Sequence, residues 1–398
     1  MDVGRLKWFI KKLGNWEYFC LSLLVIINLV IHFAIINNPP QIVFDEKYYV
    51  NDARLITDNH TTERTEHPPL GKLLVTSGVV LFGDNPFGWR FFSVIFGTFN
   101  IMLFYLICRN LKMSVRASNI AVFLLTFENL SFVQGGLAML DVFSLTFTLL
   151  SFWLYLRQNY PLSALAAALA VLVKLTGVFA LLVICLHWII VRRKRTIYFA
   201  TSLLLAPLGF LLLMPAFEFI IYRRLVDFIY YTKLMLTQSA GLIFATVNHP
   251  EVIRPWTMVI IPKIMAYYYG PHYFAAISFT IWALIIPAFI YMIIRAVKKN
   301  EAGIFGVLWF SGTFLVWIPI SLLTDRVSYL YYFYPTVGAV CLGIGMGLSQ
   351  MIDFWRSRQT GKLRWAAISG VVVFLLLHLA VFVILAPVNP WAIEKWLR

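Results

Sequence analysis

The feature that most constrains this chain is a series of apolar stretches long enough to cross a lipid bilayer as helices. A helix needs about 20 mostly apolar residues to span the roughly 30 Å of hydrocarbon in a membrane. The sequence is 61% hydrophobic and only 13% charged, whereas charged residues make up about 25% of an ordinary soluble domain. The pattern therefore predicts an all-α polytopic membrane protein.

The apolar stretches divide the chain into about eleven expected transmembrane helices. The expected spans cover residues 17–36, 88–108, 117–133, 137–156, 161–173, 175–191, 197–221, 273–295, 304–323, 328–349 and 365–386. We expect no separate soluble domain, so residues 1–398 are interpreted as one transmembrane domain.

The basic residues indicate how these helices are oriented. They gather in five short segments, which read GRLKWFIKK, CRNLKMSVR, VRRKRTIY, RAVKKN and WRSRQTGKLR. All five fall on one side of the membrane if 161–191 forms two short helices that turn at Lys174. Because basic loops face the cytoplasm, we expect a cytoplasmic N-terminus and an extracytoplasmic C-terminus, with the plasma membrane as the location. The net charge of +15 then reflects contact with anionic membrane lipid, and no nucleic-acid partner is expected.

Two long loops, 37–87 and 222–272, fall on the outer side of the membrane. The segment PPLGKLLVTSGVVLFG in the first loop has the length and apolar content of a helix that lies in the membrane interface. The segment RLVDFIYYTKLML in the second loop places five residues on one helical face. These residues are Leu225, Phe228, Ile229, Thr232 and Leu236. The outer surface is therefore expected to carry a platform of interfacial amphipathic helices.

The first outer loop contains the residues best suited to chemistry. Asp45 and Glu46 form an acid pair at the membrane edge, where partial desolvation can tune a carboxylate toward a general base. A solvated loop is the alternative reading. In EHPPLGKLL, His67 and Lys72 begin a helix after two prolines, which is also what a simple proline cap would give. Glu66 and His67 have no evident third ligand nearby, so no protein-bound metal is expected.

Basic residues on the outer side point to an anionic ligand. Arg90, Lys174 and Arg326 each lie at the end of an expected helix, and Arg254 lies in the second outer loop. Lys174 is the most informative, because the preceding helix covers only about 20 Å and the turn should dip into the membrane. A lysine there is costly unless it meets an anion. Snorkelling to lipid headgroups is the alternative for a single arginine.

Together these charges fit transfer of a group from a lipid-linked phosphate. Cations can hold the phosphate, while one carboxylate deprotonates an acceptor. A polyprenyl phosphate leaves as a stable anion and needs no proton from a second acid, unlike the leaving group in glycoside hydrolysis.

The order of the motifs resembles the protein O-mannosyltransferases, the dolichyl-phosphate-mannose–protein mannosyltransferase family of C-type glycosyltransferases (GT-C). The similar segments, which run across almost the whole chain, are FDEKYYVNDA, EHPPLGKLL, GWRFFSVIFGTFNIMLFY, ENLSFVQGGLAMLDVF, LVKLTG, RPWTMVIIPKIMAYYY and DRVSYLYYFYP. No MIR-type soluble domain is inserted between the seventh and eighth expected helices, which is typical of bacterial and archaeal members.

The resemblance implies a GT-C fold and transfer of mannose, or a similar hexose, from a polyprenyl or dolichyl phosphate to a protein Ser or Thr hydroxyl, with inversion. It assigns the catalytic carboxylate to Asp45, with Glu46 assisting at the acceptor. The implied roles of the remaining residues are binding of the donor phosphate by Arg90, Lys174 and Arg326, and shaping of the acceptor side by His67, Asp141 and Arg254. No cofactor is implied, and assistance by a divalent cation is left open.

Two alternatives remain open from the sequence. Aminoarabinose transferases of lipid A share the scaffold but glycosylate a lipid, so the acceptor could be a lipid instead of a protein. A transporter or flippase is the other alternative. It is disfavoured because transporters place polar groups near the middle of the membrane, whereas this chain collects them at one face.

Overall fold

The structure, a computed structural model, describes residues 16–193, 195–269, 272–358 and 361–387. The elements of the first half are α2 (Trp16–Ile35), α3 (Glu46–Asn59), α4 (Pro69–Phe82), α5 (Pro86–Asn110), α6 (Val115–Thr126), α7 (Asn129–Gly136), α8 (Leu140–Leu156), α9 (Tyr160–Val173), η1 (Leu175–Val178), α10 (Phe179–His187), η2 (Trp188–Arg192) and α11 (Thr196–Leu203).

The second half continues the helical pattern after a long loop. Its elements are α12 (Leu205–Tyr222), α13 (Phe228–Ala240), α14 (Thr257–Ile260), β1 (Ile264–Tyr269), β2 (His272–Ala276), α15 (Phe279–Trp282), α16 (Ile285–Val297), α17 (Glu301–Phe310), η3 (Ser311–Leu315), α18 (Trp317–Thr324), η4 (Leu330–Phe333), α19 (Tyr334–Arg358) and α20 (Gly361–Leu385).

The expected integral membrane protein is confirmed by the helices. Within the described residues, seven helical segments are long and apolar enough to cross a membrane, or eight if α7 and α8, which bend by 109° at their junction, count as one span. Four shorter apolar helices accompany them: α4, α6, α9 and α16. The total of about eleven spans stays a prediction. A break at Lys174 separates α9 from η1 and α10, as the sequence predicts.

Buried aromatic residues hold the centre of the bundle together. The ring of Phe152 on α8 lies 5.3 Å from that of Phe305 on α17 and 5.4 Å from that of Trp309. Small residues permit a close approach between α5 and α7. A methyl group on Gly97 would lie 2.9 Å from the Cα of Gly135, so a larger residue would push the two helices apart. This packing fixes the outer ends of α5, α7 and α8, where the candidate site lies.

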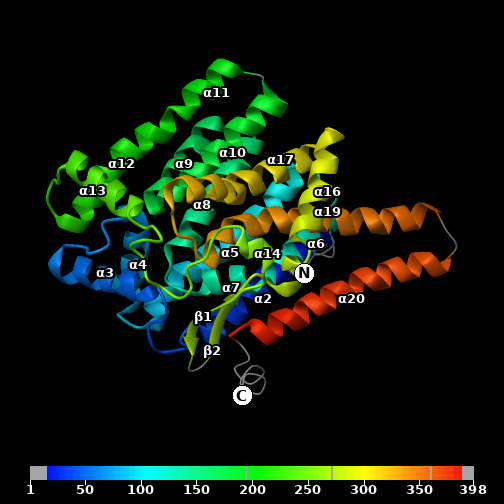
Figure 1. The fold of residues 1–398 in the computed structure, drawn as a ribbon, viewed down its shortest axis with the longest axis horizontal. Coiled ribbons are helices and arrows are strands. Elements are labelled where there is room, and N and C mark those ends of the chain that lie inside the picture. The colour runs from blue at the N-terminus through cyan, green and yellow to red at the C-terminus, as the bar shows by residue number, and fades with distance from the viewer. Residues whose placement is uncertain (1–15, 194, 270–271, 359–360, 388–398) are drawn as a thin grey trace, which may run out of the picture.

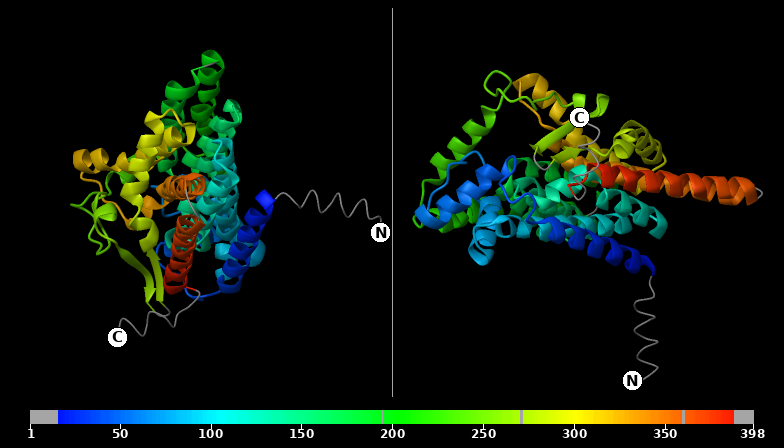
Figure 2. Two further views of the ribbon diagram at one scale, coloured as in Figure 1. Left: turned by 90° about the vertical axis from the view of Figure 1, so that its right-hand side faces the viewer. Right: turned by 90° about the horizontal axis from the view of Figure 1, so that it is seen from below.

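The outer loops contain the helices that the sequence predicts. The segment after His67-Pro68 forms α4, and α13 covers most of the predicted amphipathic segment. Ile229 and Leu236 on α13 remain 76% and 53% exposed, and Leu225 just before it is 84% exposed. An exposed apolar face of this kind suits a helix that lies in the membrane interface. In Figures 1 and 2, α3, α4 and α13 gather at one end of the molecule, and the last turns of α19 lie at the other.

One part of the second outer loop differs from the all-α expectation. Strands β1 and β2 form an antiparallel hairpin, so the predicted span 273–295 begins as a strand and becomes helical only at α15. The aromatic-rich run in β1 alternates between exposed and buried positions, which favours a strand. Polar side chains at the start of α7 anchor the end of the hairpin and the residues after it: Asn129 accepts the Ala276 N–H at 2.7 Å, and Glu128, just before α7, accepts the Ser278 N–H at 2.9 Å.

Candidate active site

Glu46 and Arg90 form a buried ion pair behind the first outer loop. The two Glu46 oxygens accept from Nε and Nη2 of Arg90, each at 2.8 Å. Glu46 also accepts the backbone N–H groups of Val43 at 3.1 Å and Ala138 at 2.9 Å. The remaining Arg90 donors reach three backbone carbonyls, of Ile36, Pro39 and Gln41, at 2.9–3.1 Å. The pair therefore joins the end of α2, the start of α3, α5 and the turn before α8.

This geometry does not fit the roles predicted for these two residues. Arg90 is 1% exposed and Glu46 is fully buried. Because each side chain already has several partners, Arg90 has no free face for a donor phosphate and Glu46 has none for an acceptor. Asp45 and Glu46 are neighbours at the start of α3, so their side chains point in different directions. Only one of the two can enter the site.

Asp45 occupies the position just before α3, at the wall of a cavity of about 440 Å³ that we call the outer cavity. The titratable or charged residues that line it are Asp45, Lys47, Arg64, Glu66, His67, Asp141, Lys174, His249 and Arg326. Within the described part of the chain, the Asp45 carboxylate makes no hydrogen bond or ion pair. Burial raises the pKa of Asp45 to about 6, against the opposing charge of Lys174. A carboxylate with this pKa is suited to act as a general base near neutral pH.

Lys174 lines the same cavity and is held by Asp141. Its Nζ donates to Asp141 Oδ1 at 2.8 Å, and both side chains are about nine-tenths buried. The ammonium also lies 5.3 Å and 5.6 Å from the ring centres of Tyr331 and Tyr332, which is within cation–π range. The structure thus brings Asp45, Asp141 and Lys174 together, from the start of α3, the start of α8 and the break after α9.

His67 also lines the outer cavity, on the loop before α4. Burial, with the nearby charges of Lys174 and Lys72, holds the pKa of His67 well below its usual range. The imidazole is therefore neutral at pH 7, and its ring lies 6.0 Å from that of Tyr49. A neutral histidine can share hydrogen bonds with a sugar or a hydroxyl without adding charge to the cavity.

Arg64 and Glu66 line the same cavity, although the sequence alone did not single them out as a pair. Arg64 Nη1 lies 3.4 Å from Glu66 Oε1, and the guanidinium lies 3.5 Å from the centre of the Tyr48 ring. Both side chains are partly exposed, so they can reach a ligand. Their charged surroundings in TTERTEHPP look like an ordinary solvated loop, and only the fold shows that this loop turns toward Lys174.

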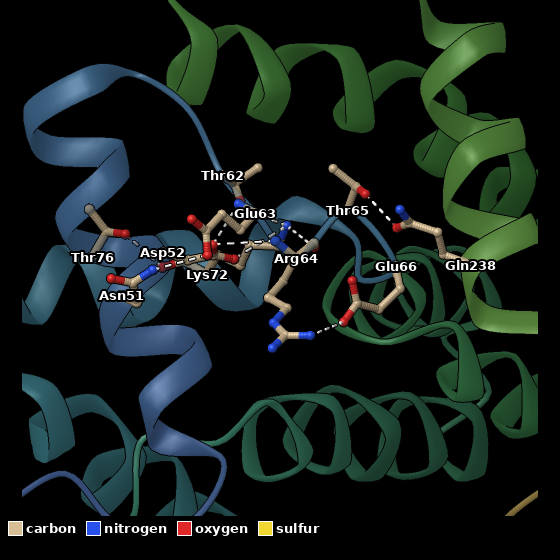
Figure 3. A network of polar contacts seen from close by, with 10 residues as sticks. All are labelled: Asn51, Asp52, Thr62, Glu63, Arg64, Thr65, Glu66, Lys72, Thr76 and Gln238. Atoms are coloured by element: carbon tan, nitrogen blue, oxygen red, sulfur yellow. Dashed lines mark hydrogen bonds and ion pairs between the residues drawn. The ribbon is translucent and has the colours of Figure 1, made fainter. Parts of the chain in front are cut away.

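A buried brace holds the loop that carries Arg64, Glu66 and His67, as Figure 3 shows. Lys72 on α4 donates to Thr62 Oγ1 at 3.1 Å and to the Arg64 carbonyl at 2.5 Å. Asp52 on α3 lies 3.7 Å from Lys72 Nζ and accepts the N–H groups of Glu63 and Arg64 at 2.9 Å and 3.3 Å. At Arg64, the brace bonds only to the backbone. The Arg64 side chain points away from the brace and lines the cavity.

The same loop is tied to the second outer loop. Thr65 Oγ1 donates to Oε1 of Gln238 on α13 at 2.5 Å. Ser239 on the same helix is a wall residue of the outer cavity and accepts from Arg326 through its carbonyl. The two outer loops therefore enclose one site.

Arg326 and Arg254, both predicted to belong to the site, differ in position. Arg326 lines the outer cavity, with a guanidinium that lies 5.9 Å from the Trp317 ring centre and a buried Nε without a partner. Arg254 is absent from the cavity wall. It pairs with Asp325 at 2.7 Å and lies 3.8 Å from the Phe244 ring centre, so it fastens the loop behind the site. Its predicted contact with the acceptor does not fit this position.

The described residues contain no group of three or more His, Cys, Asp or Glu side chains that could hold a metal ion. Among the residues described, the lysine and arginine side chains that line the outer cavity are Lys47, Arg64, Lys174 and Arg326.

The helical membrane fold is the GT-C fold. The chain aligns with the S. cerevisiae protein O-mannosyltransferase Pmt1–Pmt2 complex bound to the sugar donor with a TM-score of 0.71 and 12% identity, covering 94% of this chain and 90% of that one. It also aligns with the Archaeoglobus fulgidus oligosaccharyltransferase AglB in complex with an inhibitory peptide and a dolichol-phosphate, with a TM-score of 0.63 and 12% identity, over 96% and 56% of the two chains.

Sequence similarity identifies the family within this fold. Residues 22–232, just over half of the 398, match the family described as dolichyl-phosphate-mannose-protein mannosyltransferase, and the chain belongs to it. A polyprenol-phosphate-mannose–protein mannosyltransferase of Mycobacterium tuberculosis is 36% identical over 116 residues. That match covers 28% of this chain and only 22% of the relative.

Proposed function

We propose that this protein transfers mannose, or a similar hexose, from a polyprenyl or dolichyl phosphate to a Ser or Thr hydroxyl of a protein, with inversion. The family membership and the named relatives support the donor and the acceptor. The observation that carries the proposal is the outer cavity, in which an unpartnered carboxylate, Asp45, faces a buried ammonium, Lys174. The proposed site lies on the extracytoplasmic face of the plasma membrane, with the N-terminus in the cytoplasm and the C-terminus outside.

Asp45 is the proposed general base. The acceptor oxygen attacks the anomeric carbon of the sugar, and Asp45 takes the hydroxyl proton as the new C–O bond forms. The bond from the anomeric carbon to the phosphate oxygen breaks, and its electron pair leaves with the polyprenyl phosphate. A single displacement of this kind inverts the anomeric centre. One base suffices, because the phosphate leaves as a stable anion.

Lys174 and Arg326 are proposed to bind the donor phosphate. Lys174 supplies a point charge, while the forked donors of a guanidinium match phosphate oxygens. Asp141 orients the ammonium through its 2.8 Å hydrogen bond and would share Lys174 with the donor. Arg64 and His67 line the same cavity, where they can contact the sugar or the acceptor peptide. Charge development on the leaving phosphate is thus met by cations already in place.

Replacement of Asp45 by Asn tests this proposal. Asp45→Asn keeps the shape of the side chain but removes the base, so we expect transfer from radiolabelled mannosyl-phosphoryl polyprenol to a Ser/Thr peptide to fall by about 100-fold or more. Asp58→Asn is a matched control, because Asp58 is an exposed residue near the end of α3, the helix that Asp45 precedes, and lies outside the cavity. Near-normal turnover by a folded Asp45→Asn variant would refute the assignment. Transfer to a lipid acceptor offered in parallel, with none to the peptide, would refute the protein acceptor.

A further inference from the structure

A second cavity, of about 280 Å³, lies at the opposite end of the helix bundle, and we call it the inner cavity. Helix α5 connects the two ends: Arg90 near its start contacts Glu46, while the turn that follows Asn110 forms one wall of the inner cavity. The helical rise between these positions amounts to about 30 Å. The other walls come from α6, α16, α17 and α19, at the end opposite α3 and α13 in Figures 1 and 2.

Two basic side chains of the inner cavity lack acidic partners. The side-chain ammonium of Lys112, on the turn between α5 and α6, makes no hydrogen bond or ion pair within the residues that the structure describes. Arg295 near the end of α16 has one hydrogen bond, at 3.5 Å to Gln350 Oε1, and its buried Nε has no partner. Among the residues that the structure describes, no carboxylate therefore pairs with either of these two positive charges.

Acidic groups close to the cavity are already paired. Asp353, which lines it, accepts from Arg116 at 2.5 Å. Glu301, at the start of α17, accepts from Arg192 at 2.8 Å. Neither carboxylate is positioned as the partner of Lys112 or Arg295 in the described structure.

Two helix N-termini add to the positive field of the inner cavity. Ser114 caps α6 by accepting the Ala117 N–H, and Asn300 caps α17 by accepting the Gly303 N–H. Both capping residues line the cavity, so the first turns of two helices open onto it. The N-terminal end of a helix carries partial positive charge and stabilises anions. Two helix ends and two unpaired cations around one polar cavity form an arrangement suited to a phosphate group.

We propose that the inner cavity binds a phosphate-bearing anion, of the kind present in the headgroup of an anionic phospholipid or in free phosphate. The Ser114 hydroxyl and the amide N–H groups of Gln350 line the same cavity and can donate hydrogen bonds to phosphate oxygens. This site is separate from the outer cavity, and its occupation needs no sugar donor. It would anchor the bundle to the membrane surface opposite the proposed active site.

Binding to purified full-length protein in a neutral detergent tests the proposal. Short-chain phosphatidylglycerol and inorganic phosphate are titrated separately, with sodium chloride at matched ionic strength as the reference, and the dissociation constant is obtained from the shift in melting temperature. Both phosphate-bearing ligands are expected to shift the melting temperature if the phosphate itself is recognised. A melting-temperature shift with phosphatidylglycerol but not with inorganic phosphate supports a lipid headgroup as the ligand. A shift with inorganic phosphate as large as that with phosphatidylglycerol supports the free ion.

The Lys112→Asn/Arg295→Gln double variant is expected to weaken binding by about tenfold or more, because each cation supplies a charge-assisted hydrogen bond. Lys299→Asn is the matched control. Lys112 and Lys299 both adopt the left-handed backbone conformation, with φ of 59° and 58°, which Asn tolerates. Lys299 follows α16 but does not line the cavity. Equal weakening by the control, unchanged binding by the double variant, or no response beyond that to chloride would overturn the proposal.

Discussion

Two of the buried ion pairs behind the outer face, Glu46–Arg90 and Asp141–Lys174, differ in what surrounds them. Glu46 and Arg90 bond to five backbone groups besides each other. Glu46 accepts two backbone N–H groups, and Arg90 donates to three backbone carbonyls. The Asp141–Lys174 pair has the same 2.8 Å separation, but both residues line the outer cavity. The Glu46–Arg90 pair therefore serves to hold neighbouring segments together, whereas the Asp141–Lys174 pair can also contact a ligand in the cavity.

This contrast shows that an ion pair is informative about function only when the cavity beside it is known. Buried pairs contribute little net stability compared with apolar packing, yet removal of one partner is strongly destabilising. We therefore expect changes at Glu46 to appear as loss of folded protein and changes at Lys174 to appear as loss of donor binding. The following experiments test this separation, in order of decreasing effect.

Glu46→Ala is expected to give the largest effect. It leaves the Arg90 guanidinium buried without its carboxylate, which costs about 3–5 kcal/mol of folding stability. The check is the yield of folded protein and its unfolding midpoint in detergent. If the Glu46→Ala variant instead folds with unchanged stability and loses only transfer activity, Glu46 takes part in the reaction and not only in the fold.

Lys174→Met is expected to weaken donor binding with less loss of stability. Loss of a charge-assisted contact to phosphate costs about 1.5–3 kcal/mol, which corresponds to roughly 10- to 100-fold in affinity. Titration with mannosyl-phosphoryl polyprenol measures the effect. The Asp141→Asn/Lys174→Met double variant serves as a control for the carboxylate left unpaired. Unchanged donor affinity in both variants would remove Lys174 from the phosphate site.

Lys72→Met tests whether the brace positions the loop. The change leaves Asp52 without its cation and the Arg64 carbonyl without its donor, at a cost of about 1–3 kcal/mol in stability. We expect a higher KM for the peptide acceptor and little change in donor affinity, because Arg64 and His67 move while Lys174 stays in place. A fall in donor affinity as large as that of Lys174→Met would contradict this division.

The smallest expected effect is that of pH on transfer by the unmodified protein. Asp45 acts as a base only when ionised, and its pKa of about 6 lies above the usual range because of burial. Protonation below this pKa lowers the rate, so kcat/KM at pH 5 should be about a tenth of its high-pH value. A pH profile at constant ionic strength measures this. A rate that stays constant down to pH 4.5 would exclude a raised pKa at the catalytic base.

The sequence predicted the fold and part of the site because both leave strong local patterns. Apolar stretches identify a membrane bundle, and the break at Lys174 follows from the distribution of basic segments. Asp45, Lys174, His67, Asp141 and Arg326 were expected near one another, and the structure brings all five to the outer cavity. That they act as proposed stays a prediction.

Other features depended on directions and long-range contacts that a single sequence does not contain. Nothing in the string FDE tells which acid faces inward, so Glu46 and Arg90 were given roles in the site that their burial does not fit. Arg64 and Glu66 resemble any charged loop until the brace from Asp52 and Lys72 turns that loop inward. The β1–β2 hairpin was missed because its apolar and aromatic residues also suit a membrane helix.

The hydrogen bond between Thr65 and Gln238 joins positions that are 173 residues apart in the chain. This hydrogen bond links the two outer loops. A lengthened or exchanged second loop would therefore displace the backbone that carries Arg64 and His67. Chimaeras within this family should therefore take both loops from the same parent, because loops from different parents would not preserve this contact.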